Sequence, residues 1–151
     1  MKTSFPTYAK NLSELLCRRE WDDVEKLAQS IAKVWQEGRQ FFLCGNGGSA
    51  ANATHLANDF LYGISSTEKS GLDVEALTAN TSVLTCLAND EGYDEIFSIQ
   101  LEAKAKKGDL LLVLSGSGNS MNVIRALQVG AKLGMTTFSI LGLTGGRCLD
   151  E

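Results

Sequence analysis

The sequence predicts an α/β fold with a parallel sheet, preceded by two N-terminal helices. Two short apolar runs, residues 40–44 and 110–114, have the composition of strands buried on both faces. A loop of glycine and serine follows each run, and apolar residues then recur at helical spacing over 48–62 and 119–133. A further strand is expected over 135–141. Strand, loop, helix and strand in succession predict right-handed crossovers between parallel strands.

Two amphipathic helices are expected before the sheet. Apolar residues recur at helical spacing over 8–17 and 21–35, and Gly38 should end the second helix. These N-terminal helices are assigned to 5–38 and the α/β core to 39–151. A chain of 151 residues has the length of one ordinary domain.

The middle of the chain predicts shorter elements. Residues 72–77 alternate briefly and suggest a second strand. Asn80 should cap a short helix over 81–87, and Asp94 should cap another over 95–106, because both side chains can accept backbone N–H bonds.

Composition and charge exclude several classes of protein. The formal net charge is −4 with no basic stripe, so nucleic-acid binding has little support. The sequence contains no run of about 18 apolar residues, as a membrane span would need. The N-terminus lacks an apolar signal core. The four cysteines include no Cys-x-x-Cys pair and fit a reducing compartment. We therefore expect a cytoplasmic protein that binds neither membrane nor nucleic acid.

The two glycine and serine loops, CGNGGS at 44–49 and SGSGNS at 115–120, are suited to an anion. Ligands of open parallel sheets bind beyond the carboxyl ends of the strands, where both loops begin. Glycine permits close backbone approach, and a helix N-terminus presents N–H groups with a favourable dipole. Hydroxyls from Ser115, Ser117 and Ser120 add donors. The loops therefore predict a phosphate site that needs no lysine or arginine.

Two other interpretations of the loops stay open. Residues 115–120 could form only a flexible turn with a helix cap. The first loop also fits Gly-x-Gly-x-x-Ala through Gly45, Gly47 and Ala50, a loose dinucleotide fingerprint. That fingerprint expects an acidic residue about 20 positions on. Glu75 lies 30 positions after Gly45, and a dinucleotide would leave the second loop unused.

Two further positions could carry chemistry. The sole histidine, His55, lies four residues before Asp59, so the two should share one helix face and could meet a divalent metal. Two ligands are fewer than the three or four of a usual metal site, and a histidine held near the sheet by a carboxylate is the alternative. Asp90, near Gly92, is either a sugar ligand or a helix cap.

Together these residues resemble the sugar isomerase (SIS) domain and, within it, the sedoheptulose 7-phosphate isomerases, also called phosphoheptose isomerases. The resemblance covers about residues 5–148. Its motifs are CGNGGSAA at 44–51, His55 with Asp59, LANDEGY at 87–93, Gly108 with Asp109, and SGSGNS at 115–120.

The resemblance implies a three-layer, doubly wound, flavodoxin-like SIS fold, as a single domain over 1–151. It also implies a homotetramer with active sites between subunits. The implied reaction converts sedoheptulose 7-phosphate, a ketose, into an aldose heptose 7-phosphate through an enediol. A non-catalytic SIS module that binds a phosphosugar or another protein is the alternative.

The same resemblance assigns roles to single residues. His55 and Asp59 would bind zinc, and Asp59 would also transfer the proton. The remaining zinc ligands would lie outside this chain. The substrate-binding residues that it implies are Asn46, Gly47, Ser49 and Asp90 for the sugar, and Ser115, Gly116, Ser117, Asn119 and Ser120 for the phosphate.

The chain departs from the family in three places. Asp59 stands where the family usually has glutamate, and Gly116 where many members have threonine. The family also continues through a C-terminal strand and a long helix, whose glutamine and histidine complete the metal site. Because this sequence stops at Glu151, we expect it to be a fragment.

Overall fold

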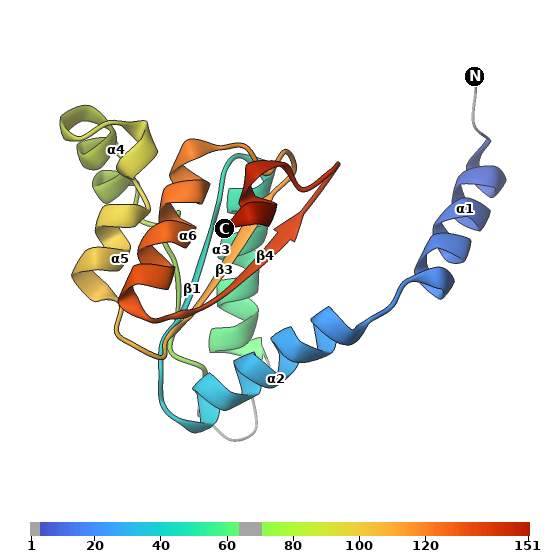
Figure 1. Ribbon diagram of the computed structural model, residues 1–151, viewed down its shortest axis with the longest axis horizontal. Helices are drawn as coiled ribbons and strands as arrows, with labels where there is room; N and C mark the ends of the chain where they lie inside the picture. The colour runs from blue at the N-terminus through green and yellow to red at the C-terminus, as the bar shows by residue number, and fades with distance from the viewer. Residues whose placement is uncertain (1–3, 64–70) are drawn as a thin grey trace.

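The computed structural model describes residues 4–63 and 71–151. Within these ranges two helices come first, and four strands then alternate with four further helices and the 3₁₀ turns η2 and η3 (Figure 1). The helices are α1 (Phe5–Arg18), α2 (Asp22–Gln36), α3 (Gly48–Leu61), α4 (Thr81–Asp90), α5 (Ser98–Lys104) and α6 (Met121–Leu133). The strands are β1 (Phe41–Gly45), β2 (Val74–Ala76), β3 (Leu110–Ser115) and β4 (Thr136–Leu141), and the 3₁₀ turns are η2 (Tyr93–Glu95) and η3 (Gly146–Asp150).

All four strands are parallel and lie in the order β2-β1-β3-β4. The predicted parallel sheet is therefore confirmed. From β1 the chain goes first to one side of the sheet, to β2, and then to the other side, to β3 and β4. The point between β1 and β3 is thus the topological switch point, where open α/β sheets bind ligands.

Helices cover both faces of the sheet and make the predicted three layers. On one face, Phe42 and Cys44 of β1 pack with α4, α5 and α6. On the other face, Phe41 and Leu43 pack with α2 and α3 (Figure 1). Every residue of β1 is buried, as an apolar strand between two helical layers must be.

Most predicted helix boundaries agree with the structure within a few residues. The Asn80 carboxamide caps α4 by accepting the Val83 N–H at 3.2 Å, as expected, although α4 runs on to Asp90. Gly38, with φ +62°, follows α2. Gly134 ends α6 in the left-handed conformation, which glycine adopts without strain.

One predicted helix is wrong at its start. Asp94 does not cap a helix over 95–106, because it lies inside the 3₁₀ turn η2, and α5 begins only at Ser98. Between them Ile96 and Phe97 are both buried in the core. The short turn lets these two side chains enter the core, and that burial outweighs the local capping preference.

Helix α1 projects away from the α/β body (Figure 1). None of its residues is buried, and its predicted apolar stripe is open to solvent, with Leu12, Leu15 and Leu16 between 42% and 65% exposed. An exposed stripe of this size is typical of a surface that another chain covers. Among the described residues, no helix combines the length and the apolar character needed to cross a bilayer.

Candidate active site

The two glycine and serine loops meet at the carboxyl edge of the sheet, as predicted. Strands β1 and β3 pair from Phe41 with Leu110 to Gly45 with Leu114, so both loops leave the sheet at neighbouring positions. A Cβ on Gly45 would lie 2.7 Å from the Leu114 carbonyl oxygen, so the close approach requires glycine. Helix α3 begins inside the first loop and α6 begins directly after the second, so the N–H groups of both first turns lie at one edge.

Hydrogen bonds to the backbone of Gly118 hold the second loop closed. The Gly118 N–H donates to Ser115 Oγ at 3.0 Å, and the Cys148 N–H donates to the Gly118 carbonyl at 2.9 Å. Gly118 has φ +64°, and a Cβ there would collide with the Gly145 carbonyl oxygen. This loop is therefore packed against the turn at Gly145.

Asn119 also holds the loop in shape. Its Oδ1 accepts the Arg147 N–H at 3.1 Å, and its Nδ2 donates to the Ser117 carbonyl at 3.0 Å. The sequence did not indicate this contact, because Arg147 is 28 positions away. One N–H of the carboxamide remains for a ligand.

The hydroxyls of the second loop differ in how they are used. Ser115 is buried, and Ser117 Oγ accepts the Asn119 N–H at 3.2 Å. Ser120 is the N-cap of α6, yet its side chain caps no helix N–H. Gly116 is exposed, and a Cβ there would meet open space. The Ser120 hydroxyl and the exposed loop backbone are thus open to a ligand.

The first loop carries a hydrogen-bonded amide. Asn46 follows β1 and exchanges two hydrogen bonds of 2.9 Å with Asn122 of α6, and it accepts a third, of 3.0 Å, from Tyr93. Gly47 is exposed with φ +56°, and Ser49 is half-buried in the first turn of α3. Asn122 and Tyr93 were not predicted. A signal for Asn122 existed, since it is the polar member of the buried face of α6.

His55 and Asp59 share one face of α3, as their spacing predicts. His55 Nε2 lies 3.3 Å from Asp59 Oδ2, and the side chains are 75% and 47% exposed. His55 thus lies beside a carboxylate, as the alternative also expects, although its ring is largely exposed. Within 4–63 and 71–151, no group of three or more histidine, cysteine and acidic residues is placed to hold a metal.

Asp90 is the last residue of α4, and its carboxylate faces back along the helix. It accepts hydrogen bonds from Asn89 Nδ2 at 2.7 Å and from Cys86 Sγ at 3.4 Å. These bonds hold the pKa of Asp90 below its usual value, with the larger effect from Asn89. Its carboxylate caps no helix N-terminus. Three residues later Tyr93 bonds to Asn46, so the end of α4 adjoins the first loop.

Native-state thiol labelling should distinguish the four cysteines. Cys44 and Cys148 are buried, and burial raises the pKa of both thiols, so both should resist iodoacetamide until the protein unfolds. Cys86 is exposed, but its hydrogen bond to Asp90 and the charge of that carboxylate raise its pKa. We expect Asp90→Asn to speed Cys86 labelling several-fold at pH 7.5, measured by peptide mass spectrometry. An unchanged rate would contradict the contact, and exposed Cys17 is the internal control.

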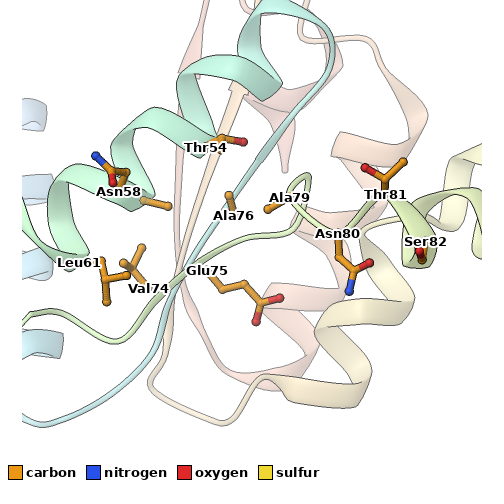
Figure 2. Close-up of a pocket in the computed structure, with 11 residues that line it drawn as sticks. Thr54, Asn58, Leu61, Val74, Glu75, Ala76, Ala79, Asn80, Thr81 and Ser82 are labelled. Carbon is orange, nitrogen blue, oxygen red and sulfur yellow. The ribbon is translucent and has the colours of Figure 1, made fainter.

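A hollow of about 580 Å³ lies away from the loops, at the edge strand β2 (Figure 2). Side chains of α3, β2 and the start of α4 line it, among them Thr54, Asn58, Glu75 and Thr81 (Figure 2). None of the predicted site residues lines this hollow. The candidate site is therefore the open edge between the two loops.

Comparison with known families matches residues 4–142 of this chain to the SIS domain model. The chain belongs to the SIS domain family. Within it, the chain is 47% identical over 140 residues to the phosphoheptose isomerase of Chlorobaculum parvum, covering 92% of this chain and 67% of that protein. It is 48% identical over 126 residues to that of Aliarcobacter butzleri, covering 83% of this chain and 66% of the relative. It is thus a member of the phosphoheptose isomerase family.

Solved structures show the same SIS fold. The phosphoheptose isomerase GmhA of Neisseria gonorrhoeae is 34% identical, with a TM-score of 0.81 over 95% of this chain and 72% of the other. A phosphoheptose isomerase of Francisella tularensis, 24% identical, shares the fold with a TM-score of 0.86 over 99% of this chain and 81% of the other. The chain spans about two thirds of the length of the curated SIS relatives that it matches.

Proposed function

We propose that this chain acts as a phosphoheptose isomerase that converts sedoheptulose 7-phosphate into an aldose heptose 7-phosphate. The observation that carries the proposal is the meeting of two anion-suited loops at the switch point of an SIS sheet. The names of the relatives at 47% and 48% identity support this substrate.

The second loop is proposed to hold the phosphate of the substrate. Its backbone is closed by bonds to Ser115 and Asn119, which present it in one conformation. Gly116 is exposed and offers a backbone N–H. Ser117 and Ser120 add hydroxyl donors, and the first turn of α6 adds N–H groups and a favourable dipole.

The first loop and the helix after it are proposed to meet the reacting end of the sugar. Asn46, Gly47, Ser49 and Asp90 would contact its oxygens. Asp59 would remove a proton from C1 of the ketose, whose C–H electrons form the C1–C2 double bond of the enediol as the C2 carbonyl oxygen gains a proton. Return of a proton to C2, with loss of the O1 proton, would give the aldose.

Zinc is proposed as the cofactor, with His55 and Asp59 as two of its ligands. His55 Nε2 and Asp59 Oδ2 lie 3.3 Å apart on an exposed helix face, a separation that fits two ligands of one ion. The described residues supply no third ligand nearby, so the others would come from outside them. A bound zinc would polarise a sugar oxygen as a Lewis acid.

A homotetramer with active sites between subunits is proposed as the assembly. The exposed stripe of α1 supports this, because Leu12, Leu15 and Leu16 offer an apolar surface that a second copy could cover.

The exposed free thiols of Cys17 and Cys86 support a cytoplasmic location.

The decisive experiment is incubation of the full-length protein with sedoheptulose 7-phosphate, with and without added zinc. We expect an aldose heptose 7-phosphate to accumulate and deuterium from D₂O to enter at C2, both visible by NMR. Binding of the ketose without product under either condition would instead indicate a non-catalytic phosphosugar-binding module. Fructose 6-phosphate is the matched control substrate, because it keeps the ketose end and lacks one carbon.

A further inference from the structure

Three side chains, Asn46, Asn122 and Tyr93, form one hydrogen-bonded group beside the first loop. They come from three separate places, the position directly after β1, the first turn of α6 and the start of η2. Nδ2 of each asparagine donates to Oδ1 of the other at 2.9 Å. The Tyr93 hydroxyl donates to Asn46 Oδ1 at 3.0 Å.

These bonds use all but one of the hydrogen-bonding positions of the Asn46 carboxamide. An amide oxygen accepts two hydrogen bonds and an amide nitrogen donates two. Asn122 and Tyr93 occupy both acceptor positions of Asn46 Oδ1, and Asn122 also takes one N–H. The capacity that remains is a single N–H. A ligand that contacts this side chain must therefore offer an acceptor oxygen.

Burial fixes this arrangement from the inside. Asn122 is 2% exposed, and both of its side-chain polar atoms are bonded to Asn46. Rotation of Asn46 away would leave a buried amide without partners, which is costly. Asn46 itself is half-buried, whereas Tyr93 is 59% exposed. The group thus connects the interior of the protein to the open edge where the two loops meet.

We propose that Asn122 and Tyr93 are positioning residues that hold Asn46 as an N–H donor toward an oxygen of the sugar. This inference rests on the proposed function, in which Asn46 contacts the substrate. Negative charge grows on the C1 and C2 oxygens as an enediol forms, and a donor fixed in advance stabilises that charge without reorganising. The donor would thereby favour the transition state over the bound ketose.

A double-mutant cycle on the full-length protein tests the positioning role. Tyr93→Phe removes one donor from an exposed side chain, and we expect kcat/KM for sedoheptulose 7-phosphate to fall about three- to tenfold with Tm unchanged. Asn122→Ala should lower kcat/KM by about tenfold or more and also lower Tm. In an Asn46→Ala background, both substitutions should leave kcat/KM unchanged, because the residue through which they act is gone.

Two further variants sharpen the test. Asn46→Asp keeps the shape and the acceptor oxygens but has no N–H, so its loss should match that of Asn46→Ala. Tyr62→Phe, like Tyr93→Phe, removes a phenolic hydroxyl. Tyr62 is 72% exposed at the end of α3, and this variant should behave as wild type. Activity retained in Asn46→Asp would overturn the donor role. Equal effects of Tyr93→Phe in both backgrounds would overturn the positioning role.

The Kd of sedoheptulose 7-phosphate, measured by calorimetry for the same set of variants, separates this inference from the proposed function. If the wild type binds the sugar without turnover, the proposed reaction fails. The positioning role then stands if Tyr93→Phe weakens binding only when Asn46 is present. If turnover is normal and the cycle shows no coupling, the reaction stands and the positioning role fails.

Discussion

Replacing Asp59 by asparagine should lower kcat for sedoheptulose 7-phosphate by about a hundredfold or more, because a positioned base contributes about 10²–10⁴ to a proton transfer. Asparagine has nearly the same size as aspartate but cannot take a proton at neutral pH. Because the second loop is the proposed phosphate site, KM should change little. Steady-state kinetics on the full-length protein, with progress followed by NMR, would measure both constants.

The control for this prediction is a longer carboxylate at the same position. Asp59→Glu adds one methylene and keeps a group that can take the proton, so it should keep kcat within about tenfold of the wild type. Asp23→Asn, in the first turn of α2, removes a carboxylate that is 84% exposed and pairs with Lys26, and it should be silent. If Asp59→Asn kept nearly full kcat, Asp59 would not be the base.

Alanine at Gly118 should be the most destabilising single change in the second loop. Gly118 has φ +64°, which an alanine adopts only with strain, and the new Cβ would collide with the Gly145 carbonyl. Strain and backbone displacement together should lower the free energy of unfolding by about 2–4 kcal/mol. For a chain of this length the loss corresponds to a drop in Tm of roughly 5–15 °C, measurable by calorimetry.

Gly116→Ala is the matched control in the same loop. A Cβ on Gly116 would meet nothing within 4 Å, and its φ is outside the left-handed region. Its stability should therefore stay within about 0.5 kcal/mol of the wild type. Equal Tm values for the two variants would show that the second loop does not pack against the Gly145 turn.

The sequence was sufficient for features that depend on short segments. The apolar run ending at Cys44 predicts a strand buried on both faces, because no polar side chain interrupts it. The four-residue spacing of His55 and Asp59 determines that they share a helix face. Strand pairing then brings the two loops together without further information from side chains.

Features that depend on distant partners were out of reach. Asn46 and Asn122 are 76 positions apart, and no local pattern pairs them. Asn119 likewise meets Arg147 only because the turn at Gly145 folds back over the second loop. The cap predicted at Asp94 failed for a related reason, since burial of Ile96 and Phe97 decides where the helix begins. Tertiary packing overrides local preference at such places.

The order of the strands has a consequence for hydrogen exchange. Strands β1 and β3 are the two inner strands, so their amides are bonded to a neighbour on each side and buried under helices. Amides of this kind exchange only through the largest openings of a protein. Both loops of the candidate site begin at the carboxyl ends of these two strands. We therefore expect the amides of β1 and β3 next to the site to exchange last, and those of α1 and the edge strands to exchange first.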